Sequence, residues 1–345
     1  MKTVLITGGA GFFGELLKKR LLDNNFYCVS VDLEKDQFSY KNLVSIQGDI
    51  RNIETLEDIF SQYKFDVIFH CAAILAHAIK DKDFLWSCNV DGTRNIAEFA
   101  KKYKVPKVIF MSSNCLWGES FNRPVKEDDM PKPVEIYGKS KWEGEKILLE
   151  YTDYFDVIIF RCPTIIDCGR LGLLAILFEF IDEGRKVWVL GGGNNKYQFI
   201  YAQDLIDACV KVLEYNKSDI FNIGSSNVKF FKEIYNYVIQ KANTGAKVAS
   251  LPKKLTVLLM KIAHMLRVSP LGPYQYKMLG ESFIFDVTKI KEKLNWKPTL
   301  TNEEMLYEAY EYYHKNLESI RKRIDVSAHK QAAKMGVIKL LKWLS

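Results

Sequence analysis

The stretch Thr7-Gly-Gly-Ala-Gly-Phe-Phe-Gly14 decides the fold of this chain. It follows an apolar run, Val4-Leu5-Ile6, that is typical of a buried strand, and it opens a helix-like segment over residues 15–22. Glycines at positions 8, 11 and 14 let the backbone turn tightly and approach a pyrophosphate, while the helix N-terminus offers unpaired N–H groups and the positive end of its dipole. This context predicts a phosphate cradle, and an ordinary strand–helix turn is the alternative.

Asp32 strengthens that prediction. It closes the next apolar run, Tyr27–Val31, and lies 18 residues past Gly14. This distance is close to the spacing expected of a carboxylate that binds the ribose of a nucleotide. The first 32 residues therefore predict a nucleotide-binding strand–helix–strand unit.

The composition is that of an ordinary globular protein. The 345 residues can bury a large core and are enough for two lobes. Hydrophobic residues make up 48% and charged residues 26%, no apolar run reaches the roughly 20 residues of a spanning helix, and no cleavable signal precedes the first strand. The seven scattered cysteines fit reduced thiols and have no metal-ligand spacing. We expect a cytoplasmic protein without a metal site.

The net charge of +7 is concentrated at one end of the chain. Residues 321–345 contain seven Lys or Arg against one Asp, so 7 − 1 = +6 of the excess lies there and the remainder is close to neutral. A neutral body argues against nucleic-acid binding, whereas the basic tail has the charge to bind a partner of its own.

Continuous apolar runs alternate with amphipathic helical segments along the chain. Such runs indicate a parallel sheet covered on both faces, that is, a doubly wound α/β architecture. We expect a dinucleotide-binding domain over residues 1–165 that is completed by about 200–225, a smaller discontinuous lobe over 166–320, and a basic tail over 321–345. In the smaller lobe, residues 186–190 predict a strand and most of the remainder predicts helix. The predicted strands of the main sheet are Thr3–Ile6, Tyr27–Val31, Leu43–Ile46, Val67–His70, Lys107–Met111, Val157–Phe160 and Ile220–Ile223.

Tyr137 and Lys141 form a Tyr-x-x-x-Lys pair at the start of a predicted helix. At i and i+4 the two side chains share a helical face, so we expect the ammonium to lie near the phenol and lower its pKa. Surface helices often carry such a pair by chance. Here, however, a strand also ends at Ser113 and delivers a hydroxyl to the same edge of the sheet. Ser113 can hold a substrate oxygen while Tyr137 transfers its proton, so the three residues are the candidate catalytic set.

Taken together, these motifs resemble the extended short-chain dehydrogenase/reductase family, in its sugar-nucleotide epimerase and dehydratase branch. The resemblance runs from residue 1 to about residue 315 and implies a Rossmann sheet with a C-terminal substrate lobe. The segments that carry it are TGGAGFFG (7–14), Asp32, Gly48-Asp-Ile50, His70-Cys-Ala-Ala73, Asn89-Val-Asp-Gly-Thr93, SSNCLWG (112–118), YGKSK (137–141), Gln198–Asp204, Phe221–Gly224 and Leu294–Pro298.

The resemblance also implies a role for individual residues. The glycines cradle the pyrophosphate, the acidic residues serve the adenosine end, and Lys141 also meets the nicotinamide ribose. A carboxylate at position 32 repels a 2′-phosphate, so NAD is favoured over NADP, although Lys35 is nearby. Asn89 as a helix cap and Asp49 as a turn residue are plainer alternatives. The implied cofactor contacts are Gly8, Gly11, Phe12, Phe13, Gly14, Asp32, Asp49, Ile50, Ala72, Ala73, Asn89, Tyr137 and Lys141.

The two residues that directly follow Ser113 differ from those of the family's dehydratases. Those enzymes place Asp-Glu there, whereas this chain has Asn114 and Cys115, which argues against a 4,6-dehydratase and against a related decarboxylase. Relatives that epimerise at C3 and C5 have a catalytic cysteine at the position of Cys115. No second base follows within residues 165–170, so Cys115 is either an additional acid/base or a small packing residue.

The substrate segments fit no single subfamily. The epimerase pattern has Arg-Asp where this chain has Tyr197-Gln198, which weakens the case for a nucleotide-sugar substrate. The residues that remain as candidate substrate contacts are Asn114, Arg161, Arg170 and Lys196, and each of the three cations could equally be a surface or salt-bridged residue.

A rival interpretation draws on the apolar helix predicted over residues 255–266, which resembles the hydroxysteroid-dehydrogenase-like branch. Residues Val337, Ile338, Leu341 and Leu344 of the tail share a helical face opposite its lysines, so the tail could contact the inner face of an anionic membrane or pack on the body. Membrane contact would make a lipid-linked sugar plausible.

We conclude from the sequence that this is an NAD-dependent epimerase of a nucleotide-linked or lipid-linked sugar, acting at C4 through a transient keto-sugar. The alternatives are an NAD(P)-dependent dehydrogenase or reductase of a sugar or lipophilic alcohol, a 3,5-epimerase that uses Cys115, and a non-catalytic NAD-binding protein. The resemblance implies a homodimer that pairs the helices around residues 86–103 and 140–154.

Overall fold

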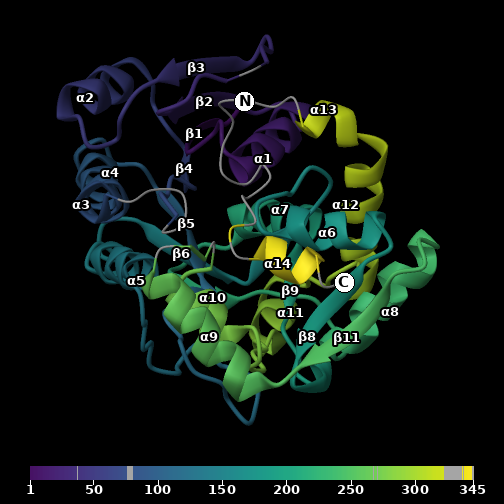
Figure 1. The fold of residues 1–345 in the computed structure, drawn as a ribbon. Helices are drawn as coiled ribbons and strands as arrows, with labels where there is room; N and C mark the ends of the chain where they lie inside the picture. The colour runs from purple at the N-terminus through teal and green to yellow at the C-terminus, as the bar shows by residue number, and fades with distance from the viewer. Residues whose placement is uncertain are drawn as a thin grey trace.

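A seven-stranded parallel sheet forms the centre of the protein (Figure 1). The computed structural model describes residues 1–36, 38–75, 81–266, 268–269, 271–321, 336 and 338–343. The strand order is β10-β6-β5-β4-β1-β2-β3. Each strand overlaps one of the seven predicted runs, so the predicted doubly wound architecture is confirmed. The strands are β1 (Thr3–Thr7), β2 (Tyr27–Asp32), β3 (Leu43–Gln47), β4 (Val67–His70), β5 (Lys107–Ser113), β6 (Asp156–Cys162) and β10 (Asp219–Asn222).

Helices cover both faces of this sheet, and the side chains of β1 show how. Val4 and Ile6 pack in one apolar cluster with α1 (Phe12–Asp23) and α7 (Ala202–Lys211), whereas Leu5 packs in a second cluster on the opposite face. A strand buried on both faces must be apolar throughout, which explains its continuous hydrophobic pattern. The helices of the second cluster are α2 (Ile53–Gln62), α4 (Gly92–Lys102) and α5 (Ile136–Leu149). A short helix, α3 (Lys82–Trp86), and a π-helical turn (Ser87–Asp91) run directly into α4.

The chain beyond β6 builds two small parallel sheets and further helices. Strand β7 (Thr164–Ile166) pairs with β9 (Phe199–Tyr201), and β8 (Lys186–Leu190) pairs with β11 (Lys247–Leu251). The division into domains near residues 165 and 320 stays a prediction. The helices here are α6 (Leu174–Asp182), α8 (Phe231–Ala242), α9 (Lys253–Met265), α10 (Pro273–Met278), α11 (Thr288–Leu294), α12 (Asn302–Lys315) and α13 (Leu317–Arg321).

Some predicted elements in this region were wrong. Strand β11 lies in a segment predicted to be helical, because its partner β8 is about 60 residues earlier in the chain and a short strand depends on its partner more than on its own composition. Helix α6 begins at Leu174, two residues after Gly172, which takes a left-handed φ of 55°.

Hydrogen bonds join the late motifs of the chain, around Gln198–Asp204 and Leu294–Pro298, to their surroundings. The carboxylate of Asp204 accepts the backbone N–H of Thr299 at 2.9 Å, and the indole of Trp296 donates to the carbonyl of Asp204 at 2.8 Å. Gln198 accepts the N–H of Phe285 at 2.8 Å. These bonds connect the C-terminal part of the chain to α7 and to the residue before β9. The motifs around Asp204 and Trp296 therefore have a structural role.

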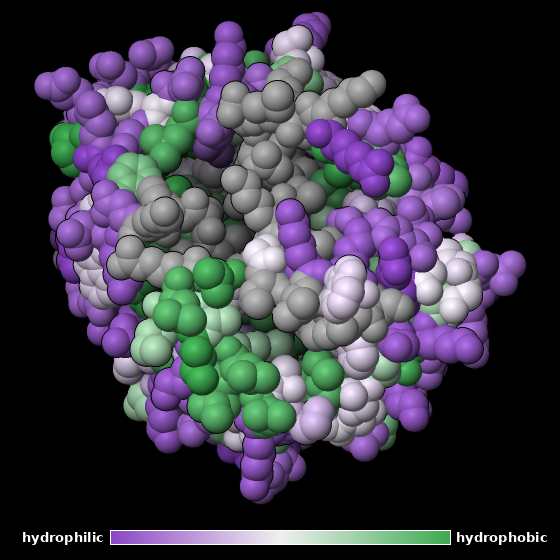
Figure 2. Space-filling view, viewed as in Figure 1, coloured by the Kyte–Doolittle hydropathy of each residue, from purple (hydrophilic) through white to green (hydrophobic). Residues whose placement is uncertain are grey.

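Helix α9 lies at the surface with an apolar side turned outward. None of its residues is buried, and an apolar patch covers α9 in Figure 2. Among the described residues, no helix is long and apolar enough to cross a bilayer.

The described part of the basic tail is one short helix, α14 (Ile338–Trp343). Its Lys342 forms ion pairs with Glu179 and Glu183 of the α6 region, the second at 2.7 Å, and Ile338 packs against the main core. These contacts favour the packed alternative for the described part of the tail. Residues 322–335, Val337 and Leu344, on which the rest of the tail prediction depends, lie outside the described residues.

Candidate active site

The turn between β1 and α1 leaves no room for side chains at two of its glycines. Gly8 has a left-handed φ of 72°, and a Cβ there would lie 2.6 Å from the backbone nitrogen of Ala72. A Cβ on Gly14 would lie 2.1 Å from the carbonyl oxygen of Gly8. Gly11 donates its N–H to that same oxygen at 3.2 Å. The predicted cradle is therefore a tight turn pressed against the loop after β4, and the Phe12 and Phe13 side chains are buried beside it.

A buried lysine, Lys18, which the sequence analysis did not single out, donates a hydrogen bond to this turn. Lys18 of α1 donates to the carbonyl of Gly9 at 2.9 Å and forms an ion pair with Asp36. The side chains of Lys18 and Asp36 are 0% and 3% exposed. Burial lowers the pKa of Lys18, while the Asp36 carboxylate opposes that shift. One ion pair thus connects the cradle to the segment that follows β2.

The acidic residues assigned to the adenosine end lie at the carboxyl ends of β2 and β3. The carboxylate of Asp32 accepts the N–H groups of Ala10 at 2.9 Å and Glu34 at 3.1 Å, which places it beside the cradle. Asp49 forms a 2.6 Å ion pair with Arg51, and this side-chain contact lowers the pKa of Asp49. Its carboxylate also accepts the N–H of Arg51, as in the turn alternative. Ile50 is buried, and its adenine contact stays a prediction, as does that of Asp49.

Asn89 fixes the loop that follows β4. Its side chain accepts the N–H of Ile74 at 2.7 Å and donates to the carbonyl of Ile74 and to the hydroxyl of Ser140, both at 3.0 Å. Asn89 therefore joins the loop of Ala72 and Ala73 to α5. It lies inside the π-helical turn and does not cap a helix with its side chain, so the capping alternative is not what the structure shows.

The candidate catalytic serine and tyrosine meet where β5 ends and α5 begins. A Cβ on Gly138 would lie 2.1 Å from the carbonyl oxygen of Cys115, so the first turn of α5 packs directly on the turn after Ser113. Burial raises the pKa of Tyr137, and the nearby Ser113 hydroxyl opposes that shift. The phenol is therefore protonated at neutral pH in the protein alone.

That Lys141 lowers the pKa of Tyr137 stays a prediction. The Lys141 ammonium lies 4.0 Å from the ring centroid of Phe110, and Tyr137 is not among the groups that shift its pKa. Burial lowers the pKa of Lys141 to about 8, against the attraction of Glu145 and two cysteines. The one-turn spacing places Tyr137 and Lys141 on the same helix, α5.

Asn114 belongs to a buried chain of hydroxyl groups next to Ser113. Its amide donates to the Tyr197 hydroxyl at 2.5 Å, and the Tyr197 and Tyr274 hydroxyls lie 3.0 Å apart. Burial raises the pKa of Tyr197 to about 12. Tyr197, the residue that replaces the expected arginine, thus faces the candidate catalytic turn, and Tyr274 is a site residue that the sequence analysis missed.

Cys115 and Glu135 are two further ionisable residues close to Tyr137. The backbone N–H of Cys115 donates to the Ser113 hydroxyl at 3.1 Å, and burial raises the pKa of the Cys115 thiol to about 12. The carboxylate of Glu135, the residue before α5, raises the pKa of both Cys115 and Tyr137 by its negative charge. All seven cysteines are free thiols, and within the described residues no group of three His, Cys, Asp or Glu side chains could hold a metal ion.

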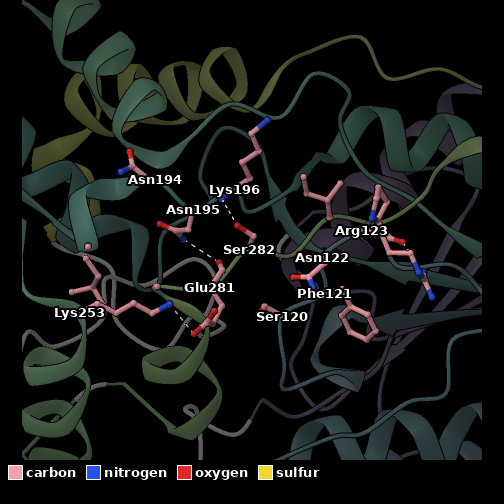
Figure 3. A pocket seen from close by; sticks show the side chains of 15 residues that line it. Ser120, Phe121, Asn122, Arg123, Asn194, Asn195, Lys196, Lys253, Glu281 and Ser282 are labelled. Carbon is pink, nitrogen blue, oxygen red and sulfur yellow. Dashed lines mark hydrogen bonds and ion pairs between the residues drawn. The ribbon is translucent and has the colours of Figure 1, made fainter.

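The predicted substrate cations lie in different surroundings in the structure. Arg161 forms a buried 2.7 Å ion pair with Glu145 and donates to the carbonyl of Glu127, also at 2.7 Å, so it is the salt-bridged residue that the sequence allowed. Lys196 lines a surface cavity of about 550 Å³ together with Arg123 and Lys253 (Figure 3). Arg123 is paired with Asp129 and Lys253 with Glu281, whereas the Lys196 ammonium lies 4.9 Å from the centroid of Phe230.

Residues 4–224 match the family model described as "NAD dependent epimerase/dehydratase family". The chain belongs to this family. The resemblance drawn from the motifs is confirmed, and the chain is an NAD-dependent epimerase or oxidoreductase of the extended short-chain dehydrogenase/reductase type.

Individual relatives of this NAD-dependent epimerase/dehydratase cover nearly all of the chain. It is 37% identical to the "Uncharacterized protein y4nG" of Sinorhizobium fredii over 99% of this chain and 86% of that protein. It is 26% identical to the UDP-glucose 4-epimerase of Lacticaseibacillus casei, over 91% and 97%. Among solved structures, the UDP-glucose 4-epimerase of Thermotoga maritima with UDP-glucose superposes with a TM-score of 0.76 at 25% identity, over 91% of this chain and 99% of that one.

The residues of this family member fit a dinucleotide cofactor. Arg170, a predicted substrate contact, has its guanidinium carbon 5.7 Å from the ring centroid of Phe12. Its Nε and Nη1 atoms are buried and have no hydrogen-bond partner among the described residues, and burial lowers the pKa of Arg170 to about 10. A buried cation without a partner is costly, so an anion bound beside the cradle would stabilise it. The glycine turn and Arg170 thus fit the pyrophosphate of NAD.

Proposed function

We propose that this chain is an NAD-dependent sugar epimerase that acts at C4. The observation that carries the proposal is the packing of the first turn of α5, with Tyr137, on the turn that follows Ser113 at the end of β5, with Lys141 one helical turn further along α5. A hydroxyl pair at the carboxyl edge of a parallel sheet lies where ligands of doubly wound folds bind. The relatives named as UDP-glucose 4-epimerases support the same reaction.

The cofactor would be held by the cradle and by the loops around it. Gly8, Gly11 and Gly14 would receive the pyrophosphate, with Arg170 as its cation, and Asp32 would accept the ribose hydroxyls. Asn89 holds the loop of Ala72 and Ala73 in place. When bound, NAD would supply reversible hydride-transfer chemistry at the carbinol carbon of the sugar. A carboxylate at Asp32 favours NAD over NADP.

The residues of the chain then move one proton. Ser113 holds the substrate oxygen by a hydrogen bond, and Tyr137 exchanges the proton of that hydroxyl. Because burial raises the pKa of Tyr137, its phenolate needs nearby positive charge. The Lys141 ammonium, with a pKa of about 8, and the guanidinium of Arg170 are two buried cations that can provide this charge.

The two residues that follow Ser113 reduce the number of reactions that the site could catalyse. Asn114 is an amide bonded to Tyr197, so it supplies no carboxyl group for elimination as in a dehydratase. Cys115 has a pKa of about 12 and stays a neutral thiol, which makes it a weak base for a 3,5-epimerase. Epimerisation at C4 needs neither group.

The substrate would extend from this site toward the 550 Å³ cavity of Figure 3. The cavity brings together Arg123, Lys196 and Lys253, whose cations suit a diphosphate, and we propose that it takes the carrier of the sugar. A nucleotide diphosphate and a lipid diphosphate share that chemistry, so the carrier is to be determined by assay.

The decisive experiment is Tyr137→Phe assayed with UDP-glucose and UDP-N-acetylglucosamine. We expect turnover to fall by about 10³-fold or more, because the proton relay is lost, while NAD remains bound. Tyr276→Phe on α10, outside the site, is the matched control and should keep full activity. An active Tyr137→Phe protein would refute the assignment of the base.

Tyr197 gives a reason to consider a second function. It replaces a cation at a position facing the site, which makes the site less suited to a nucleotide diphosphate and better suited to a less charged alcohol. A net dehydrogenase or reductase would change the absorbance of the reduced-nicotinamide band in step with turnover, whereas an epimerase would not. A protein that binds NAD but converts no sugar or alcohol would be the non-catalytic alternative.

The remaining predictions concern assembly and location. The dimer would pair α4 and α5, which pack on each other in one subunit, and the exposed Trp86 at the end of α3 and Leu149 at the end of α5 would lie at this interface. A cytoplasmic location, with or without contact between the tail and a membrane, also stays a prediction.

A further inference from the structure

Helix α9 carries its most apolar stripe on the outside of the protein. The stripe follows the helical repeat i, i+3, i+4 and i+7 along one face. Surface helices normally turn such a face to the core, and this one turns it to solvent. The side chains and their exposed fractions are Leu255 55%, Leu258 53%, Leu259 55%, Ile262 40%, Met265 72% and Leu266 64%.

The other side of α9 is what attaches the helix to the protein. Val257, Met260 and Ala263 are half-buried, and His264 makes a ring contact with Tyr276 of α10, 5.9 Å between centroids. Val268, just past the helix, is 50% exposed and extends the stripe. A contiguous exposed apolar patch marks an interaction surface, and Figure 2 shows such a patch over α9.

The charge around the stripe has one sign. From residue 234 to residue 280 the sequence has no Asp or Glu and seven Lys or Arg. Lys254 and Lys261 are exposed and lie on the same flank of the stripe, and Lys277 is exposed on α10. The near-neutral total of the body hides this local excess, because the compensating acids lie elsewhere in the chain.

We propose that the outer face of α9 docks on an anionic lipid bilayer, with the helix lying in the plane of the surface. An apolar stripe with lysines at its edge is the pattern of interfacial helices. At 13 residues the helix is about 20 Å long, too short to span a bilayer and long enough to lie in one leaflet. Anionic headgroups would neutralise the lysines that no nearby carboxylate in this segment balances.

A second copy of the chain fits this face less well. In a two-fold interface the same surface meets itself, so Lys254 and Lys261 of both copies would come together without acids from residues 234–280 to separate them. The tail also differs from α9, because its Lys342 is already paired with Glu179 and Glu183. The contact proposed for the tail from the sequence is therefore better made by α9.

Docking through α9 would hold the surface cavity near the lipid. Lys253, the first residue of α9, lines that cavity. Gly191, which also lines it, lies beside the Lys253 side chain. The docking does not depend on the proposed function, since it rests on the surface alone. With that function, it would bring the cavity within reach of a sugar carried on a membrane lipid.

The test is co-sedimentation of the full chain with vesicles of phosphatidylcholine containing about one third phosphatidylglycerol, an anionic lipid. We expect binding that weakens in high salt. The variant Leu255→Gln/Leu259→Gln/Ile262→Gln should bind at least about tenfold more weakly, because it removes the apolar contact while keeping good helix formers. Lys254→Gln and Lys261→Gln should each weaken binding about fivefold. Trp343→Gln, which changes the exposed apolar residue of the tail, should bind like the wild type.

Hydrogen exchange of the wild-type protein guards against a misfolded variant. Peptides covering residues 253–266 should gain protection when anionic vesicles are added and not with phosphatidylcholine alone. No sedimentation with anionic vesicles, or equal binding of the triple α9 variant, would overturn the proposal. So would loss of binding in Trp343→Gln alone, which would assign the contact to the tail, and so would a vesicle-free dimer that the α9 variant converts to a monomer, which would assign the face to a second copy.

Discussion

Replacing Lys18 with methionine tests how the phosphate cradle is held in place. Methionine matches the length of the lysine stem but leaves the buried Asp36 carboxylate without its cation and the Gly9 carbonyl without its 2.9 Å donor. Because the two side chains are 0% and 3% exposed, breaking this pair should cost about 3–5 kcal/mol of unfolding free energy. An exposed pair would cost only about 0–1 kcal/mol, so the two cases are well separated.

Lys18→Met/Asp36→Leu is the matched control, because it removes both charges together. It should lose only about 1–3 kcal/mol, the cost of the Gly9 carbonyl, and so be more stable than Lys18→Met alone. The assay is urea unfolding followed by circular dichroism and tryptophan fluorescence, with coincident curves required before a free energy is derived. NAD affinity should fall in both variants, since both lose the donor to Gly9. A Lys18→Met protein within about 1 kcal/mol of the wild type would refute the buried-pair reasoning.

The remaining predictions concern Arg170, Lys141 and the dimer. Arg170→Leu should weaken NAD binding about 10- to 100-fold without destabilising the protein alone, because its buried nitrogens have no partner to lose; unchanged NAD affinity with a raised KM would assign it to the substrate instead. The pKa of Lys141 is about 8 when folded and 10.5 ordinarily, so between these values the unfolded state binds a proton that the folded state has released. The unfolding free energy of the wild type should then rise relative to Lys141→Met by up to about 1.4 kcal/mol per pH unit, and a flat difference would contradict the depressed pKa. Trp86→Glu/Leu149→Glu should shift a dimer to monomers in analytical ultracentrifugation, and an unaffected dimer would place the interface elsewhere.

The central sheet could be predicted because its strands are buried on both faces. Val4, Leu5 and Ile6 must all be apolar when one packs toward α2 and its neighbours pack toward α1, so the strand is visible in the sequence without knowledge of its partners. Strand β11 had no such signal. Its Lys247 and Ser250 are exposed, and only pairing with β8 makes it a strand.

The candidate site could be predicted where chemistry is tied to a motif and not where it depends on burial. Ser113 and Tyr137 are near each other because their motifs occupy the ends of adjacent elements. Lys18 was missed because a lysine in an amphipathic helix normally points to solvent, and only the fold shows it buried under Gly9. Tyr274 was missed for a similar reason, because nothing in its local sequence links it to Tyr197, 77 positions earlier.

Two buried cations beside the site, Lys141 and Arg170, lack full compensation in the protein alone, and the nearby Tyr137 is neutral there. Tyr137 keeps its proton, Lys141 holds its proton weakly, and Arg170 has two nitrogens without a partner. An arrangement of this kind lowers the stability of the protein without its cofactor, since each charge is desolvated without full compensation. A bound pyrophosphate would pair Arg170, and a positively charged nicotinamide ring would favour the phenolate. The same burial that destabilises the site therefore prepares it for NAD, and the acid/base function of Tyr137 should exist only in the complex.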